Sequence, residues 1–396
     1  MSRPAKPAAL RGTTATRNEV NNMLYNTFKD KKLSALGLGT MRFPVIDDDY
    51  SKIDTEKTRE IFDYAIKNGI NYFDTAFGYH NGNSEIICGQ MLKNYPRDSF
   101  YLASKFPGFS EENVINHEEI FEKQLKKCDV EYFDFYLFHN LFSRNAGWYL
   151  DDEKYGLYTY LCKQRDAGRI KHLGVSCHCD LETLRAFLDK YGKDIEFVQI
   201  QLNWLDWTLQ DAKAKVELLN ERNIPIWVME PVRGGKLASL APNDEKALKA
   251  LRPDEGIPAW AFRYLQSIKG VTMVLSGMSN MQQITDNINT FSSFKPLSEE
   301  ENATLAKIAE GMLNSVPCTA CRYCTEGCPA GLDIPDLIKA YNRKDFEGLY
   351  GVKKLEEDKK PSACIGCRAC EAVCPQNIKI ADIMSEMAEL ITDKQE

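Results

Sequence analysis

The chain has 396 residues, 43% of them hydrophobic and 27% charged, which is enough for two or three globular domains with a sizeable core. Its formal net charge is −7 and it has no long basic run, so nucleic acid and a polybasic membrane patch are not expected as partners. No apolar stretch approaches the roughly eighteen residues that cross a bilayer, so no membrane span is expected either.

The first 22 residues are basic, small and low in hydrophobicity, and they lack the apolar core of a secretory signal. We expect residues 1–22 to be a disordered or artificially appended extension, with the natural start near Met23. A basic transit-like leader is the alternative.

From residue 33 onward, strand-like runs alternate with helical patterns. Eight such strands over about 260 residues are what a closed parallel barrel needs, so we predict a (β/α)8 TIM barrel over residues 23–295. The strand-like runs lie near 33–41, 70–75, 99–105, 133–139, 170–176, 196–202, 225–230 and 271–276. The alternation then stops, and we predict a second domain over residues 296–396.

Four polar residues follow three consecutive strand-like runs: Asp74 and Tyr79 after the first, Lys105 at the end of the second, and His139 at the end of the third. An isolated D-x4-Y is more often a capping aspartate with a half-buried tyrosine. Catalytic residues of a parallel barrel lie at the carboxyl ends of its strands. The presence of Lys105 and His139 at the ends of the next two strands therefore favours a catalytic group.

These four residues resemble the Asp-Tyr-Lys-His tetrad of the aldo-keto reductases, and the strings ALGLGTMRF, FDTAFGYHNGNSE, GRIKHLGVS and MEPVRGGKLA are similar to the same family over about residues 33 to 290. The resemblance implies reversible reduction of an aldehyde or ketone to an alcohol by NADPH or NADH. It also implies that Tyr79 is the general acid and that Lys105 adjusts the pKa of Tyr79. Asp74 then keeps Lys105 protonated, and His139 orients the substrate oxygen.

The chemistry explains why these types of residue belong together. A tyrosine has an ordinary pKa of about 10, which makes it a reluctant acid. We expect the Lys105 ammonium to lower the pKa of Tyr79, and Asp74 to keep Lys105 charged. General acid catalysis of this kind is worth about 10²–10⁴ in rate.

The same resemblance implies where the cofactor lies. Ser176 and Gln199 stand where the family holds the nicotinamide carboxamide, and the run 276–287 stands where it grips the phosphates at a helix N-terminus. The implied cofactor contacts are Gly39, Thr40, Met41, Asp74, Ser176, Gln199, Met229, Gly277, Ser279, Gln283 and Asn287.

Three departures bear on the cofactor. Cys177 stands where the family usually has Asn, and Met229 replaces the Tyr that commonly stacks on the nicotinamide. Gly277 and Gln283 stand where a Lys and an Arg usually meet the 2′-phosphate. A strong NADPH preference is therefore not expected, and NADH, weak NADPH binding and a flavin all stay open. Arg233 and Lys236, nearby in the sequence, could supply the missing charge.

Eight of the thirteen cysteines fall in two runs of the form C-x2-C-x2-C-x3-C-P, Cys318 to Pro329 and Cys364 to Pro375. Without a secretion signal we expect a reducing cytoplasm and metal, not disulfides. The spacing is that of bacterial iron–sulfur ligation, whereas zinc usually takes two C-x2-C pairs across a longer loop. The crossed-ligand rule assigns one [4Fe–4S] cluster to Cys318, Cys321, Cys324 and Cys374, and the other to Cys364, Cys367, Cys370 and Cys328.

Helical patterns between and after the two cysteine runs, LDIPDLIKAYNRKDF and IKIADIMSEMAELI, resemble a helical ferredoxin module more than a compact β-rich one. By contrast, Cys177 and Cys179, with His178 between them, are more often incidental than a metal site.

The two halves pose a chemical problem, because nicotinamides pass two electrons at once and a cubane normally passes one. A flavin usually joins them, and no flavin motif is visible. Three functions stay open. The chain is a carbonyl reductase whose clusters exchange electrons through a flavin or a ferredoxin-like partner, the same enzyme with structural clusters, or a non-catalytic redox sensor or electron carrier. The intact tetrad argues against the last.

Overall fold

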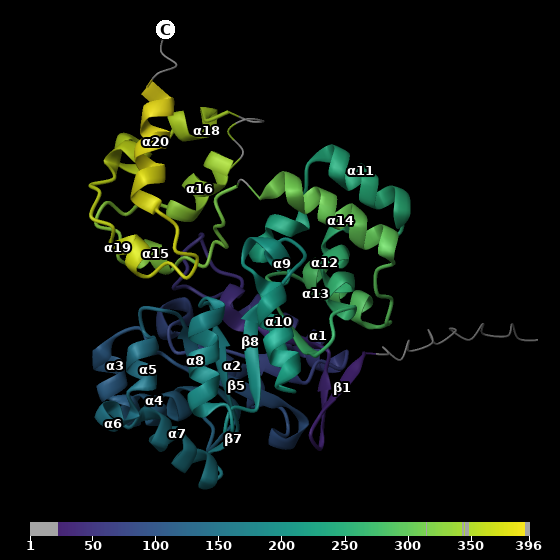
Figure 1. The fold of residues 1–396 in the computed structure, drawn as a ribbon, viewed down its shortest axis with the longest axis vertical. Coiled ribbons are helices and arrows are strands. Elements are labelled where there is room, and N and C mark those ends of the chain that lie inside the picture. The colour runs from purple at the N-terminus through teal and green to yellow at the C-terminus, as the bar shows by residue number, and fades with distance from the viewer. Residues whose placement is uncertain (1–22, 314, 343, 345–347, 393–396) are drawn as a thin grey trace, which may run out of the picture.

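The computed structural model describes residues 23–313, 315–342, 344 and 348–392. The extension expected over residues 1–22 lies outside these ranges. Figure 1 shows a large barrel domain and a smaller C-terminal domain that is placed over one end of it. No helix in the described part of the chain is both long enough and apolar enough to cross a membrane.

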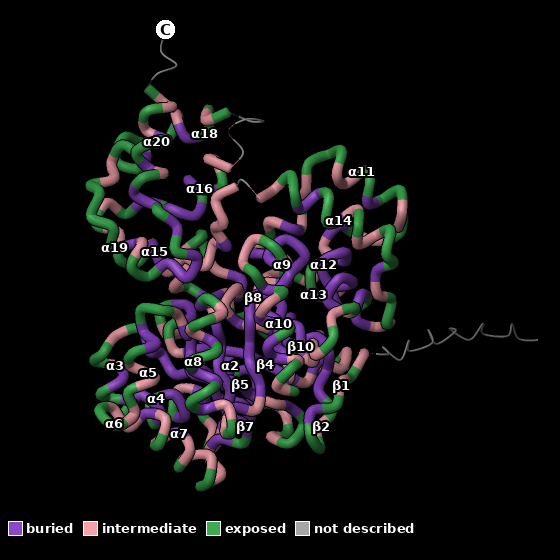
Figure 2. The backbone as a smooth tube through the Cα atoms, viewed as in Figure 1, coloured by how far each residue is buried: buried purple, intermediate pink, exposed green. Residues whose placement is uncertain are grey.

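The barrel is closed by parallel pairing all the way round, in the order β10-β3-β4-β5-β6-β7-β8-β9. This confirms the predicted (β/α)8 fold. The strands are β3 Leu36–Gly39, β4 Tyr72–Asp74, β5 Tyr101–Phe106, β6 Phe133–Leu141, β7 Ile170–Cys177, β8 Phe197–Gln201, β9 Ile226–Met229 and β10 Val271–Gly277. Each is short and almost wholly buried, and the buried backbone in Figure 2 follows these strands.

Amphipathic helices surround the strands. In the first, Asp54 caps the N-terminus by accepting from the Lys57 amide, and Ile61, Phe62 and Ala65 face the sheet. The helices of this layer are α1 Thr55–Lys67, α2 Ser84–Leu92, α3 Glu111–Ile115, α4 His117–Cys128, α5 Ala146–Leu150, α6 Asp152–Tyr155, α7 Leu157–Asp166, α8 Leu181–Tyr191, α9 Asp206–Leu209, α10 Ala212–Glu221, α11 Pro242–Leu251, α12 Ile257–Gln266 and α13 Met281–Phe291.

A hairpin of β1 (Tyr25–Phe28) and β2 (Lys31–Ser34) precedes the barrel. The run predicted as one strand over 33–41 is instead divided at Ala35 between β2 and β3. Phe28 reaches into the barrel and packs edge-on against Trp227, with 5.1 Å between the ring centroids. This aromatic plug fills the end of the barrel where the strands begin, which leaves the opposite end for chemistry.

Helix α14 (Glu299–Met312) follows the barrel and begins with a capping box of Ser298 and Glu301. Its residues Leu305, Ile308 and Ala309 belong to the core shared by the barrel strands and helices. Although α14 lies beyond residue 295, where we expected the barrel to end, it packs with the barrel.

The C-terminal domain is helical, as predicted, and contains no strand among its described residues. Its small separate core combines ligand-type cysteines with aliphatic residues such as Leu337 and Met384. In each cysteine run a single arginine, Arg322 or Arg368, takes the left-handed conformation just before a one-turn helix. The helices are α15 Tyr323–Glu326, α16 Ile334–Asn342, α18 Tyr350–Lys353, α19 Ala369–Ala372 and α20 Ile380–Thr392.

Candidate functional site

A cavity of about 850 Å³ lies at the carboxyl ends of the barrel strands. Barrel residues form most of its wall. Thr319, Cys321 and Tyr323 of the C-terminal domain complete that wall. The cavity is therefore shared between the two domains.

The four residues of the predicted tetrad come together at this cavity. The Lys105 ammonium is fully buried and donates to Asp74 Oδ1 at 2.6 Å, to the Thr75 carbonyl at 2.8 Å and to the Tyr79 hydroxyl at 3.3 Å. The Tyr79 and His139 rings meet edge to face, with 5.9 Å between centroids. Asp74 ends β4, Lys105 lies near the end of β5, and His139 lies near the end of β6.

Tyr79 begins a tight turn, Tyr79–Gly82, in which His80 and Asn81 have positive φ angles. The His80 imidazole holds this turn in place: Nδ1 lies 2.7 Å from the Tyr50 carbonyl, and Nε2 accepts from the Phe43 amide at 3.3 Å. The imidazole is fully buried between the rings of Phe43 and Tyr50. The position of the Tyr79 hydroxyl is thus fixed by packing behind it, on the side away from the cavity.

Burial and the ion pair shift the pKa values of Lys105 and Asp74 in opposite directions. Burial lowers the pKa of Lys105, and Asp74 opposes this shift. Burial likewise raises the pKa of Asp74, opposed by Lys105. The pKa of Tyr79 lies well above 10 because burial disfavours the phenolate, reinforced by the nearby Tyr323 and Asp74. The expectation of a lowered Tyr79 pKa is therefore wrong, because burial keeps the phenol protonated.

His139 is buried, and its pKa lies well below 6.5 because burial and the charge of Lys105 disfavour the imidazolium. It is therefore a neutral hydrogen-bonding group. The Tyr149 hydroxyl donates to the His139 carbonyl at 2.7 Å, and the Phe109 ring packs edge-on against the imidazole. Among the described residues, His139 Nδ1 has no hydrogen-bond partner.

A second layer of buried polar groups supports Lys105 from behind. Glu85 accepts from the Ser104 hydroxyl at 2.6 Å and from the Gln124 amide at 2.7 Å, and it pairs with Lys127 at 2.7 Å. Gln124 also donates to the Lys105 carbonyl at 3.0 Å. Sequence reasoning missed this network, because its members come from α2, β5 and α4 and share no local motif.

Most residues implied as cofactor contacts line the cavity, and two do not. Thr40 is buried and bonds to the Ser84 hydroxyl at 2.7 Å, and the Ser176 hydroxyl accepts from the Asn140 amide at 2.7 Å. Both are buried and do not line the cavity. Those that line the cavity are Gly39, Met41, Asp74, Gln199, Met229, Gly277, Ser279, Gln283 and Asn287.

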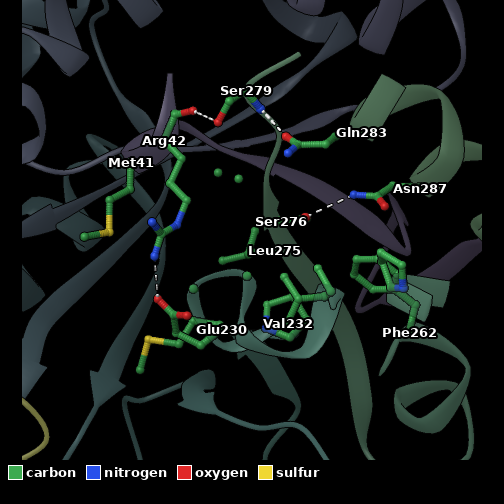
Figure 3. Close-up of a pocket in the computed structure, with 18 of the residues that line it drawn as sticks. Met41, Arg42, Glu230, Val232, Phe262, Leu275, Ser276, Ser279, Gln283 and Asn287 are labelled. Atoms are coloured by element: carbon green, nitrogen blue, oxygen red, sulfur yellow. Dashed lines mark hydrogen bonds and ion pairs between the residues drawn. The ribbon is translucent and has the colours of Figure 1, made fainter. Parts of the chain in front are cut away.

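Figure 3 shows one side of this cavity, where the Ser279 backbone amide donates to the Gln283 side-chain oxygen at 2.7 Å and the Asn287 side-chain amide donates to the Ser276 hydroxyl at 3.1 Å. Gln199 Oε1 and Asp74 Oδ2 are buried without a partner in the described part of the chain. Buried polar atoms of this kind ordinarily have partners, so they suit a ligand with amide and hydroxyl groups, as a nicotinamide nucleoside has.

One of the cations that line the cavity, Arg42, was not singled out from the sequence. Arg42 crosses the cavity wall between β3 and β10, pairs with Glu230 at 3.5 Å and donates to the Thr319 carbonyl at 3.0 Å. Arg233 and Lys236 do not line the cavity: Arg233 pairs with Asp206, and Lys236 donates to the Ser315 hydroxyl. The expectation that these two supply charge to a cofactor phosphate is wrong, because both are turned into the domain junction.

Tyr323 connects the two domains at the tetrad. It follows the ligand-type Cys321 by two residues, and its ring packs against Phe109 with 5.8 Å between centroids. Phe109 in turn contacts His139. Tyr323 also lines the cavity, so an aromatic wall next to the tetrad comes from the cysteine-rich domain. The position of Tyr323 between Cys321 and Cys324 is the sequence signal that could have identified it.

The eight C-terminal cysteines form two groups. One cavity is lined by Cys318, Cys321, Cys324 and Cys374, and we call this the first cysteine site. Another is lined by Cys328, Cys364, Cys367 and Cys370, and we call this the second cysteine site. In both, the fourth cysteine comes from the other run, which is the grouping that the crossed-ligand rule predicts.

The sequence spacing of these cysteines is that of bacterial [4Fe–4S] ligation and differs from the two C-x2-C pairs that zinc usually takes. A cubane binds its four thiolates at four separate iron atoms, so its ligands stand further apart than those of tetrahedral zinc.

Comparisons with known proteins agree with both halves of this description. The model of the Aldo/keto reductase family matches residues 35–310. The chain belongs to the aldo/keto reductase family. Residues 317–378 of this aldo/keto reductase match the 4Fe-4S dicluster domain, so an iron–sulfur domain follows the barrel.

The relatives of this aldo/keto reductase are distant. It is 27% identical over 212 residues to "Probable aldo-keto reductase 1" of Glycine max, a match that spans 52% of this chain and 57% of that protein. It is 23% identical over 337 residues to the "NADH-specific methylglyoxal reductase" of Escherichia coli strain K12, across 72% of this chain and 97% of that protein. Family membership and these relatives support an oxidoreductase.

Among solved structures, the holo form of the aldo-keto reductase AKR11C1 from Bacillus halodurans is similar, with a TM-score of 0.59 and 23% identity. The match covers 72% of this chain and 96% of that one. At this identity the likeness concerns the fold, and it supports the barrel alone.

Proposed function

We propose that this protein reduces a small aldehyde or ketone to an alcohol with NADH as the preferred donor, and that its two cysteine sites each hold one [4Fe–4S] cluster. The observation that carries the proposal is the buried Asp74–Lys105–Tyr79 chain, which opens with His139 onto a cavity large enough for a cofactor and a substrate. The E. coli relative whose name specifies NADH and methylglyoxal supports both parts of the reaction class.

The residues of the tetrad divide the work of carbonyl reduction. The nicotinamide supplies the hydride when it is bound. His139, neutral and fixed by Tyr149, hydrogen-bonds the substrate oxygen and orients it. Tyr79 donates its proton to that oxygen as negative charge develops there. Lys105, at 3.3 Å from the phenol and held charged by Asp74, stabilises the phenolate that remains.

The preference for NADH is supported by the charges of the cavity wall. Gly277 and Gln283 offer no cation, and the lining includes the acids Asp254, Glu255 and Asp286 as well as Arg263 and Lys295. Arg263 is already held by Glu255 at 3.0 Å and by the Thr290 carbonyl at 2.8 Å. A 2′-phosphate would thus lack a free guanidinium fork, whereas a ribose 2′-hydroxyl can donate to a carboxylate.

The proposed reaction is tested by following the hydride. With NADH deuterated at C4 and a panel of short aldehydes and α-dicarbonyls, we expect deuterium at the carbinol carbon of the product, measured by mass spectrometry. We also expect kcat/KM to be about tenfold or more higher with NADH than with NADPH, and Gln283→Arg to reduce this difference. The matched control is Gln282→Arg, which changes the neighbouring residue of α13 outside the cavity. Alcohol formed without deuterium would contradict hydride transfer.

Activity should depend on pH through Lys105. Since His139 stays neutral and Tyr79 stays protonated at neutral pH, we expect kcat/KM to be level from about pH 6 to about pH 8. It should fall on the alkaline side, as Lys105 loses its proton at a pKa that burial places below 10.5. Because Asp74 raises that pKa, Asp74→Asn should move the alkaline limb down by about 1 pH unit or more. An unmoved limb would contradict the assignment.

A second role, electron exchange between the cavity and the first cysteine site, is favoured by one observation: Cys321 lines both cavities. For the anaerobically reconstituted protein we therefore expect NADH to bleach part of the cluster absorbance, with one of its two electrons passing to each cluster and its proton to solvent. Carbonyl reduction with no bleaching would leave the clusters a structural role.

A further inference from the structure

Arg233 is a fully buried cation at the junction of the two domains. It follows β9, and its Nε donates to Asp206 Oδ1 at 2.9 Å. Both terminal nitrogens, Nη1 and Nη2, are buried and have no hydrogen-bond partner among the described residues. A buried guanidinium with unmet N–H groups is costly, so its position suggests an acceptor that belongs to the complete protein.

The loop that carries Arg233 lies against the first cysteine run. A Cβ placed on Gly234 would come within 2.1 Å of the Thr319 carbonyl oxygen, so the two backbones are in direct contact. Lys236, three residues after Arg233, donates to the Ser315 hydroxyl, and burial lowers its pKa to about 8. Two cations of the barrel therefore lie beside the segment that begins at Cys318.

A chain of buried hydrogen bonds joins Arg233 to the wall of the first cysteine site. Asp206, the partner of Arg233, accepts from Gln201 at 2.7 Å, and the Gln201 side-chain oxygen accepts from Gln376 at 2.8 Å. Gln376 lies two residues after Cys374 and lines the first cysteine site. The residues that line this site all belong to the C-terminal domain, and Gln376 is the one through which hydrogen bonds connect it to Asp206 and Arg233 of the barrel.

The second cysteine site has no such neighbour. Cys367 is exposed, and so is Ile365 beside it. The arginine in its cysteine run, Arg368, is half-exposed and pairs with Glu371 at 3.1 Å and with Asp382. In the described part of the chain, Arg233 is thus a buried cation of the barrel near the first site, whereas the arginine beside the second site is half-exposed.

We propose that Arg233 donates its two unpartnered terminal nitrogens to sulfur atoms of the cluster in the first cysteine site and, together with Lys236, holds the midpoint potential of that cluster above that of the second. The inference rests on the proposed ligand sets. Reduction adds one electron to a group that is already anionic through its four thiolates. A nearby buried cation favours the reduced form, and hydrogen bonds to the sulfurs act in the same direction.

The experiment is a redox titration of the full-length, anaerobically reconstituted protein, followed by EPR of the reduced clusters. We expect two midpoint potentials. Arg233→Met should lower only the higher one, changing the equilibrium constant for electron exchange between the clusters by about tenfold or more, which is about 59 mV for a one-electron couple. Arg233→Lys, which keeps the charge but loses the fork, should give a smaller shift.

Lys236→Met and Arg368→Gln complete the test. Lys236→Met should lower the same potential as Arg233→Met, and it decides the question if Arg233→Met does not load its iron. Arg368→Gln, beside the second site, should leave the higher potential unchanged. If the Arg233→Met variant binds its clusters and both potentials are unshifted, the inference is overturned. If only Lys236→Met binds its clusters, unshifted potentials in that variant overturn it. A wild-type protein without two cluster signals would instead refute the ligand sets.

Discussion

Replacing Tyr79 with Phe should lower kcat for carbonyl reduction by about 10²–10⁴ and leave the affinity for NADH nearly unchanged. The variant removes only the hydroxyl, so the ring still packs against His139 and the turn held by His80 remains. What it removes is the hydroxyl that lies 3.3 Å from the buried Lys105 ammonium. The measurement is steady-state kinetics together with NADH binding followed by fluorescence.

The matched control is Tyr72→Phe. Tyr72 lies in β4 two residues before Asp74, is fully buried, and packs against Phe135 with 5.0 Å between ring centroids. It loses the same hydroxyl from the barrel interior, outside the cavity, so kcat should stay within about threefold of wild type. If Tyr79→Phe behaved like Tyr72→Phe, Tyr79 would not be the acid. Lys105→Met would then show whether the ammonium acts through a water instead.

The sequence was sufficient for the barrel because the strands are short, buried and regularly spaced, and because parallel topology brings Asp74, Lys105 and His139 to one end. It did not reveal the hairpin that plugs the other end. Tyr25–Phe28 is too short and too mixed in polarity to stand out, and its stability comes from Phe28 packing on Trp227 far along the chain.

The junction between the domains was the least predictable part, because its contacts join distant segments. Arg233 and Lys236 were assigned to the cofactor from their place after a strand, yet Arg233 pairs with Asp206, Lys236 donates to Ser315, and neither lines the cavity. Arg42 and Tyr323 were missed for the same reason. Each becomes part of the cavity wall only when residues about 280 apart, such as Arg42 and Thr319, are joined.

Removing iron should unfold the C-terminal domain while the barrel stays folded. The second core is small, contains no strand in its described residues, and is built partly from the cysteines themselves, Cys324, Cys370 and Cys374 among its buried members. Four ligands from two distant runs are gathered at each site only in the folded state, so the free energy of cluster binding is also free energy of folding. The barrel core, including α14, has no such dependence.

Hydrogen exchange is the measurement that separates the two domains. After anaerobic chelation, or in Cys374→Ser, we expect α16 and α20 to lose protection almost completely, while β5 and β6 keep theirs. Since Tyr323 and Cys321 wall the reaction cavity, KM for the carbonyl substrate should rise by about tenfold or more, with the Tyr79-dependent step still detectable. Cys162→Ser, on α7 of the barrel, is the control and should retain its iron. Helices that stayed protected without iron would show that the C-terminal fold does not depend on its clusters, and an unchanged KM would show that the cavity does not need its second wall.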